Sequence, residues 1–376
     1  MIKVLFLIPN LGHGGAEKVL VNLVNHMDRE KFQITVMTLY DEGVNRASLA
    51  PSIEYKACFK KSFVGVSHFL KLLSPEQLYK RLIHARYDIV VSYLEGQTAR
   101  IVSGCCDNDT KLISWIHVEQ HTAKNAARTF RSEKEMRKCY QKFDQTVCVS
   151  QFVMQDFLSI VPVKNCTVLY NTVESERIRT LADEAVEDVI ISKDECNICS
   201  VGTLKPSKGF DRLIRVHNRL RKDGLPIHTY ILGEGPEEKK LKLLVASLGD
   251  EESVSFLGYQ TNPYKYMKKC DLLVCSSFAE GFNTAATEAL IVGTPVCTVE
   301  VSGMKEMLGN NDEFGVVVDN NEEALYQGIR RLCNNPKLLE KYQRQALIRG
   351  AVFSMEKTVG AVERKFIDLK KGDYFE

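Results

Sequence analysis

The chain has 376 residues, of which 44% are hydrophobic and 26% charged. These values are typical of folded proteins and exclude a disordered, fibrous or collagen-like chain. The net charge of +2 argues against a dedicated nucleic-acid binder, and the length predicts two domains, because single cores stop growing at about 250–300 residues. Charge is uneven: residues 1–170 hold 22 Lys and Arg against 16 Asp and Glu (+6), and the remainder holds 28 against 32 (−4).

Short β-branched runs alternate with longer amphipathic patterns, which indicates parallel sheets covered by helices on both faces. The first series of expected strands is Val4–Ile8, Ile34–Leu39, Ile89–Ser92, Leu112–Trp115, Thr146–Val149 and Thr167–Leu169. The second series is Asn197–Val201, Thr229–Leu232, Ser253–Leu257, Leu272–Cys275, Pro295–Thr298 and Gly315–Val318. Two such series predict two doubly wound α/β domains.

Helical patterns lie between and after these strands, at Ala16–His26, Lys208–Leu220, Lys239–Leu248, Pro336–Arg349 and Met355–Lys370. We therefore expect a first doubly wound domain over residues 1–175 and a second over residues 196–350. The charged, weakly periodic residues 176–195 are expected to form a linker. Residues 351–376 are expected to form a C-terminal helix that crosses back to the first domain.

Cysteine usage and the N-terminus indicate a cytoplasmic protein. The 12 cysteines are scattered through apolar runs, which fits buried free thiols in a reducing compartment better than a disulfide framework. The lone pair Cys196 and Cys199 is interpreted as strand packing, not as a metal site. The first apolar run lacks a cleavage site, so a buried strand is expected there instead of a signal peptide. No run approaches the roughly 18 apolar residues that span a bilayer.

Ligands of open parallel sheets bind beyond the carboxyl ends of the strands, so function is expected in the loops that follow them. After the first strand, Gly14 and Gly15 open a helix and would let backbone N–H groups approach an anion. Tight packing explains such a turn equally well. The second domain repeats the arrangement in the run Gly202–Gly209, where Lys205 and Lys208 either neutralise a diphosphate or are solvated loop lysines.

The sharpest feature is the run Phe278–Glu288, which leads from an apolar strand into a helix expected to begin near Thr284. Successive N–H groups from Gly281 onward would point at an anion, with Glu280 and Glu288 on either side of it. Because a carboxylate that faces phosphate is unfavourable, these two are expected to accept hydrogen bonds from sugar hydroxyls. Ordinary capping of a helix by acidic residues is the alternative.

The run from Glu280 to Glu288, followed by Gly293-Thr294-Pro295, resembles the E-x7-E signature of family 4 retaining glycosyltransferases. The two glycine-rich turns and the run Phe256–Tyr259 also fall where this family expects them, so the resemblance covers nearly the whole chain. It implies the GT-B fold, in which two Rossmann-like, doubly wound parallel-sheet domains face each other across a cleft. The first domain would bind the acceptor and the second the nucleotide sugar.

The resemblance also implies roles for single residues. Glu280 would act on the transferred sugar by contacting its hydroxyls, and Glu288 would contact the ribose. Thr203 stands where the family usually has arginine, a departure that removes a bidentate phosphate contact; either Lys205 replaces that contact or the loop binds the diphosphate less tightly. The other expected donor contacts come from backbone amides, a lysine and the loop beside the base: Gly14, Gly15, Lys208, Gly258, Tyr259, Gly281, Phe282, Asn283 and Thr284.

In the first domain, His117 closes an expected strand and resembles the family's histidine near the reacting sugar. This implies a catalytic role in orienting the sugar or shielding charge, not as a nucleophile; a structural histidine is the alternative. Glu119 and His121 are weaker candidates nearby. Glu95 also follows a strand, where it either contacts the acceptor or has a structural role.

The implied reaction moves a sugar from a nucleotide-diphosphate donor, expected to be a UDP-sugar, to a hydroxyl with retained anomeric configuration. Charge builds on the leaving diphosphate, so catalysis would depend on lysines and a helix N-terminus aimed at it. No nucleophile is evident, and attack on the same face as the leaving group is implied. No cofactor and no metal are expected, because the D-x-D run Asp107–Asp109 precedes a strand and is interpreted as a turn.

Basic residues cluster in two stretches of the first domain. Residues 56–86 hold seven Lys or Arg and one Glu, and residues 121–142 hold seven basic and two acidic residues. Basic helices with apolar neighbours are typical of membrane-surface contacts, although a solvated helix face has the same pattern. We expect a protein peripheral on the inner face of the plasma membrane, with a lipid-linked or polysaccharide acceptor in cell-surface glycan synthesis and no nucleic-acid partner.

Two other functions fit the same architecture. A sugar-nucleotide epimerase would need acid–base residues in a closed site and no basic apolar surface. A non-catalytic partner subunit would keep the fold and the nucleotide pocket. Thr203 favours the partner subunit, whereas Glu280 and Glu288 argue against it.

Overall fold

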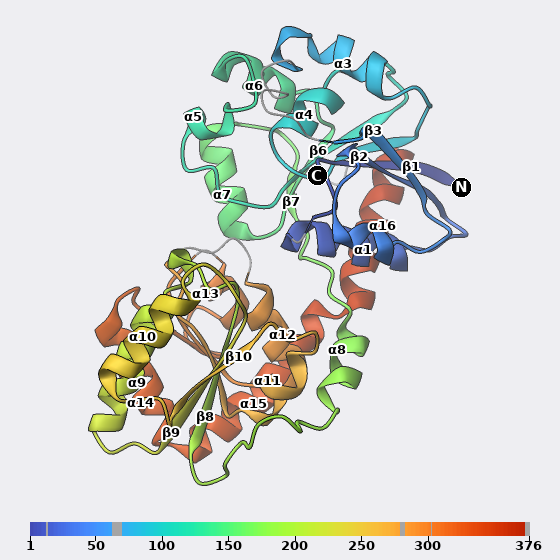
Figure 1. Ribbon diagram of the computed structural model, residues 1–376. Helices are drawn as coiled ribbons and strands as arrows, with labels where there is room; N and C mark the ends of the chain where they lie inside the picture. Colours follow the sequence, from blue (N-terminus) through green and yellow to red (C-terminus); the bar gives the residue numbers. More distant parts are fainter. Residues whose placement is uncertain (13, 62–69, 279–282, 302, 373–376) are drawn as a thin grey trace. The chain divides into compact units, whose positions relative to one another are not determined.

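The computed structural model describes residues 1–12, 14–61, 70–278, 283–301 and 303–372. It divides the chain into two compact units (Figure 1), one formed by Met1–Val173 with Met355–Glu376 and the other by Glu174–Ser354. Each unit is built on one parallel sheet. Among the helices of the described residues, none combines the length and the apolar composition that a bilayer span requires.

The first unit holds a seven-stranded sheet with the order β3-β2-β1-β4-β5-β6-β7, in which every neighbouring pair is parallel. Its strands are β1 (Ile2–Ile8), β2 (Phe32–Tyr40), β3 (Glu54–Phe59), β4 (Ile89–Ser92), β5 (Lys111–Ile116), β6 (Gln145–Cys148) and β7 (Cys166–Val168). The central strands are nearly continuous apolar runs and are buried, as expected for a sheet with both faces covered.

Helices cover both faces of this first sheet. They are α1 (Gly15–His26), α3 (Pro75–Leu82), α4 (Gln97–Val102), α5 (Ala123–Ala126), α6 (Glu133–Tyr140), α7 (Gln151–Ile160) and α16 (Met355–Lys371), with a 3₁₀ turn at Val44–Ser48. One core cluster places α3 and α4 over β1, β2 and β4. Helix α16, red in Figure 1, joins this unit because its Phe366 ring lies 6.0 Å from that of Phe6 and its Lys370 pairs with Asp88 at 2.7 Å.

The second unit holds a six-stranded sheet with the order β10-β9-β8-β11-β12-β13, again with parallel neighbours. Its strands are β8 (Cys196–Val201), β9 (Ile227–Leu232), β10 (Val254–Gly258), β11 (Leu272–Cys275), β12 (Val296–Val299) and β13 (Val316–Val318). This is the strand order of the dinucleotide-binding doubly wound fold. All six strands correspond to the second series that the sequence predicts.

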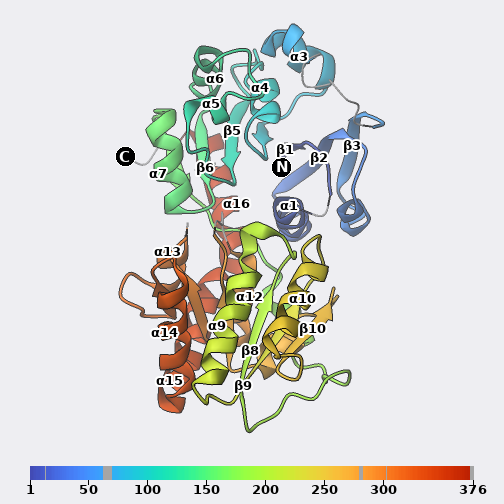
Figure 2. The same cartoon turned by 60° about the vertical axis from the view of Figure 1, so that its left-hand side comes forward.

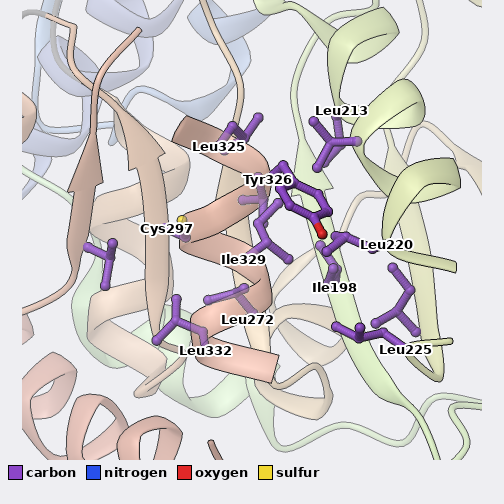
Figure 3. Packing of buried hydrophobic residues seen from close by; sticks show 14 of the residues in the cluster. Ile198, Leu213, Leu220, Leu225, Leu272, Cys297, Leu325, Tyr326, Ile329 and Leu332 are labelled. Carbon is purple, nitrogen blue, oxygen red and sulfur yellow. The ribbon is translucent and has the colours of Figure 1, made fainter. Parts of the chain in front are cut away.

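The helices of the second unit are α8 (Ser175–Ala182), α9 (Phe210–Lys222), α10 (Glu238–Leu248), α11 (Tyr264–Lys269), α12 (Thr284–Val292), α13 (Met304–Leu308), α14 (Glu322–Cys333) and α15 (Pro336–Gly350), with 3₁₀ turns at Pro206–Lys208 and Ala351–Phe353. Figure 3 shows the main core, where Leu213 and Leu220 of α9 and Tyr326 and Ile329 of α14 pack on Ile198 of β8. A second cluster joins α9 and α10 to β9 and β10. These four elements are labelled in Figure 2.

Two segments differ from the sequence prediction. Strand β3 was not predicted, because its charged residues Glu54 and Lys56 break the apolar pattern; as an edge strand, β3 leaves them free to pair with each other at 2.9 Å. Residues 176–195, expected as a linker, begin inside helix α8, which packs on α11 and α12. A short charged helix on the surface has weak periodicity and resembles a linker in the sequence.

Candidate functional site

Each sheet has one point at which the strand order reverses. Strand β1 lies between β2 and β4, and β8 lies between β9 and β11. A crevice opens beyond the carboxyl ends of the strands at such a switch point, and ligands of doubly wound sheets bind there. In the second unit the turn at residues 202–209 follows β8 and residues 276–283 follow β11, and both segments carry predicted donor-site residues.

The turn after β8 (residues 202–209, the β8 turn) and the segment after β11 are hydrogen-bonded to each other. The Phe278 N–H donates to the Ser207 carbonyl over 2.8 Å, and the Ser276 hydroxyl donates to the Lys208 carbonyl over 3.1 Å. Gly209 has a left-handed φ of 64°, and a Cβ added to it would overlap the Ser276 carbonyl. Only glycine fits this crossing, which holds Lys208 beside the end of β11.

Helix α12 begins at Thr284, as predicted, with Asn283 as its N-cap. The buried Asn283 side chain accepts a hydrogen bond from the Ala286 N–H over 3.0 Å. The first N–H groups of a helix have no intrahelical partner, and together with the helix dipole they favour an anion. The remaining residues predicted here, Glu280, Gly281 and Phe282, lie outside the described residues.

Glu288 lies one turn inside α12, where the Tyr264 hydroxyl of α11 donates to its Oε1 over 3.2 Å. Burial, together with the Glu288 charge, raises the pKa of Tyr264, so its hydroxyl stays protonated and remains a donor. Tyr264 therefore fixes the orientation of the carboxylate expected to contact ribose. Sequence reasoning missed Tyr264, because the two residues are 24 positions apart and no motif links them.

Removal of the Tyr264 hydroxyl should weaken donor binding without changing the chemical step. For Tyr264→Phe we expect the donor KM to rise about 3- to 10-fold with kcat within about 2-fold, because one hydrogen bond to a charged group is lost. The control is Tyr266→Phe on the same helix, which removes a hydroxyl bond to Asp188 at 2.6 Å instead. Equal effects of the two substitutions on KM would contradict a specific role for Tyr264.

The other residues predicted to bind the donor occupy the loops around β8 and β10. Thr203 and Lys205 are exposed, and Lys208 is half-buried. Strand β10 ends at Gly258 with a φ of 65°, and the side chain of Tyr259 is 70% exposed, as a platform for a base requires. The Tyr259 N–H is bonded to Glu234 Oε1 at 3.4 Å, a partner that the sequence analysis did not identify.

The glycine-rich turn of the first unit has the geometry expected of a helix start. Gly14 is the N-cap of α1, without a side-chain cap, and Gly15 is its first residue. A Cβ on Gly15 would meet nothing within 4 Å, whereas one on Gly14 would overlap the Glu17 carboxylate. The turn follows β1 at the switch point of the first sheet, and an anion contact by its N–H groups stays a prediction.

His117 lies just beyond β5 and is buried, with its ring 4.8 Å from that of Tyr93. Burial lowers the pKa of His117 to about 3, so the imidazole is neutral at neutral pH. Its Nε2 has no hydrogen-bond partner among the described residues. A neutral ring can hydrogen-bond a sugar hydroxyl, which suits the first of the two roles expected for it, orienting the sugar.

Glu95 is bonded to the backbone at the end of β5. Its Oε2 accepts a hydrogen bond from the His117 N–H over 3.0 Å, and burial raises the pKa of Glu95. The carboxylate thereby fixes the end of the strand that carries His117. Of the two roles expected for Glu95, this contact supports the structural one.

The weaker candidates Glu119 and His121 lie together with Asp156 of α7. Their ligand atoms are all within 4.8 Å of one another, a spacing that suits a cation. Asp156 already accepts hydrogen bonds from the backbone N–H groups of Gln120 and His121. The D-x-D run forms the predicted turn, and Arg86 binds both of its carboxylates at 2.8 and 2.7 Å.

In a comparison with known proteins, two protein families match successive parts of this chain. Residues 13–177 match Glycosyltransferase Family 4, and residues 182–349 match Glycosyl transferases group 1. A relative from Campylobacter jejuni, N-acetylgalactosamine-N,N'-diacetylbacillosaminyl-diphospho-undecaprenol 4-alpha-N-acetylgalactosaminyltransferase, is 30% identical over 95% of this chain and 97% of its own length. The lipopolysaccharide core biosynthesis glycosyltransferase LpsD of Rhizobium meliloti is 23% identical over 87% of each chain.

Solved structures with low sequence identity share the fold. The lipopolysaccharide outer core galactosyltransferase WaaB has a TM-score of 0.75 at 17% identity, over 98% of this chain and all of its own. HepE of Anabaena, in complex with UDP, has a TM-score of 0.73 at 17% identity, over 99% of this chain and all of its own. With two parallel-sheet α/β units and these family matches, the chain belongs to glycosyltransferase family 4 and has the GT-B fold.

Proposed function

We propose that this glycosyltransferase moves a sugar from a UDP-sugar to a hydroxyl of a lipid-linked or polysaccharide acceptor, with retention of the anomeric configuration. The observation that carries the proposal is the pair of hydrogen bonds between the segment after β8 and the segment after β11. These bonds hold Lys208 beside the end of β11, and the segment that follows β11 leads into α12. The relatives named above act in lipid-linked glycan and lipopolysaccharide synthesis, and HepE was crystallised with UDP, which supports this acceptor class and donor.

The chemistry places negative charge on the leaving diphosphate. Fixed dipoles and cations at that position lower the barrier, and the start of α12 and Lys208 supply them. Glu288, oriented by Tyr264, would bind the ribose, and Glu280 would hold the hydroxyls of the transferred sugar. His117 would orient that sugar as a neutral hydrogen-bonding group. Lys208 and the start of α12 would stabilise the anion without a metal ion or another cofactor.

The acceptor side of the proposal concerns the first unit. The basic residues of α5, of α6 and of the stretch between them include Lys124, Arg128, Lys134 and Lys138, which would attract an anionic membrane surface at about 1 kcal/mol each. Contact with the inner face of the plasma membrane would bring the enzyme to a lipid-linked acceptor. The Campylobacter relative's acceptor, a diphospho-undecaprenol, is a substrate of this class.

The test is release of nucleoside diphosphate from a panel of UDP-, GDP- and ADP-sugars, with lipid extract as the acceptor source. We expect release with a UDP-sugar, label in the lipid or polysaccharide fraction, and no loss of rate in EDTA. Release abolished by EDTA and restored by manganese would contradict a metal-independent mechanism. An isomerised sugar nucleotide without transfer would indicate an epimerase, and silence throughout would indicate a non-catalytic subunit.

A further inference from the structure

Arg212 of α9 is a fully buried arginine in the second unit, with only 3% of its surface exposed. Its guanidinium binds three neutral groups: Nε donates to the Ser276 carbonyl over 2.7 Å, Nη2 to the Ser277 carbonyl over 2.8 Å, and Nη1 to Asn320 Oδ1 over 2.8 Å. The guanidinium carbon also lies 4.3 Å from the centre of the Phe278 ring. Arg212 thus contacts each of the three residues that follow β11.

The positive charge of Arg212 has no anionic partner among the described residues within ion-pair distance. Arg215, one turn further along α9, shows the ordinary arrangement, because it is half-exposed and pairs with Glu322 at 2.8 Å and Asp211 at 3.1 Å. The carboxylates of Glu322 and Asp211 are not paired with Arg212. Burial, the larger effect, lowers the pKa of the Arg212 guanidinium, and the charges of these carboxylates raise it only from a distance. Buried charges are normally paired, so an anion that binds beside this guanidinium would be stabilised by its charge.

The position of this charge indicates which anion would pair with it. A Cβ added to Gly209 would lie 3.2 Å from Arg212 Nε, so the guanidinium adjoins the turn that carries Lys208. It also binds the segment that crosses this turn, since the Ser276 carbonyl accepts from Arg212 while the Ser276 hydroxyl donates to Lys208. Arg212 therefore adjoins the place where the Lys208 turn meets residues 276–278. This meeting place, the junction, is the candidate diphosphate site.

We propose that Arg212 is a positioning residue for the second phosphate of the donor: it holds residues 276–278 against the Lys208 turn, and its charge is neutralised when a diphosphate binds there. The proposal rests on the proposed nucleotide-diphosphate donor. A field from a buried charge acts on the ligand in proportion to the ligand's own charge. Arg212 should accordingly favour a nucleoside diphosphate over the matching monophosphate.

The experiment measures binding of UDP and UMP by calorimetry to the full-length wild type and to Arg212→Met, which keeps the length of the side chain without its charge. We expect the affinity for UDP to fall about 10- to 50-fold and that for UMP less than about 3-fold, because only the diphosphate places a second charge at the junction. Arg215→Met, which removes the same charge from the same helix, should change both affinities less than about 2-fold.

Several outcomes would overturn the inference: equal losses for UDP and UMP, a comparable loss in Arg215→Met, or wild-type affinity in Arg212→Met. If Arg212→Met does not fold, Arg212→Lys carries the test, because it keeps the charge but loses the fork that binds two carbonyls. It should retain the preference for UDP while the affinity for UDP falls about 3- to 10-fold. A wild type that binds none of UDP, GDP and ADP would instead refute the proposed function itself.

Discussion

Alanine at position 209 should lower the affinity for UDP by about 30-fold or more and reduce the free energy of unfolding by about 2–4 kcal/mol. Gly209 has a φ of 64°, and a Cβ there would overlap the Ser276 carbonyl. The β8 turn and the segment after β11 would have to separate, and Lys208 would lose its fixed position beside β11. UDP titration and chemical denaturation of the same preparations would measure the two losses.

The matched control is Gly249→Ala. Gly249 also has a left-handed φ, 74°, but a Cβ there would meet nothing within 4 Å. This substitution should cost about 1 kcal/mol of stability, from backbone strain alone, and leave UDP binding unchanged. Ser276→Ala is a milder test of the same junction, because it removes only the hydroxyl bond to Lys208. If Gly209→Ala binds UDP as Gly249→Ala does, the junction does not shape the donor site.

Acid should destabilise both units well above the pH at which carboxylates titrate. His117 in the first unit and His217 in the second are buried, and burial lowers the pKa of each to about 3. The unfolded chain, with histidine pKa values near 6.5, binds more protons between about pH 3 and 6.5. Stability is therefore complete above pH 6.5 and falls as pH drops, by about 1.4 kcal/mol per pH unit for each histidine.

Urea denaturation at pH 7.0 and 5.5 measures this slope. The free energy of unfolding of the wild type should fall by about 1.4 kcal/mol per histidine over this interval. His117→Gln and His217→Gln should each reduce that fall by about 1.4 kcal/mol. Of the two substitutions, His217→Gln should disturb the fold less. The ring nitrogens of His217 lie 2.8 and 2.9 Å from the Thr229 and Ser253 hydroxyls, and glutamine can replace part of these hydrogen bonds. The exposed His84 is the control. If His117→Gln and His217→Gln both lose as much stability between pH 7.0 and 5.5 as the wild type does, the two buried histidines do not cause the pH dependence.

The sequence predicted the sheets well, because a buried parallel strand is a continuous apolar run flanked by helices. All six strands of the second unit and the start of α12 at Thr284 follow from that pattern. Strand β3 did not follow, because an edge strand tolerates the charges of Glu54 and Lys56. Helix α8 did not either, since a short surface helix has too few apolar positions to show a period.

The candidate site was predictable only where residues lie close together in the sequence. The turn with Lys208 and the start of α12 are local patterns. Tyr264 and Arg212 act through contacts 24 and 64 positions away, and nothing local marks them. Arg212 illustrates the difficulty, because α9 also carries Arg215, Arg219 and Arg221, and four arginines on one helix look alike in the sequence. Only the fold shows that Arg212 is buried against carbonyls while the other three pair with carboxylates.

The measurement that tests the central claim most directly is transfer of a labelled sugar from a UDP-sugar by the wild type and by Glu280→Ala, with Glu251→Ala, at an exposed carboxylate, as the control. We predict that the wild type and Glu251→Ala form a product with the donor's anomeric configuration, resolved by proton NMR coupling constants. Glu280→Ala should lose about 1,000-fold or more in rate, as when a group that contacts the reacting sugar is removed. Inverted configuration, or undiminished transfer by Glu280→Ala, would contradict the account.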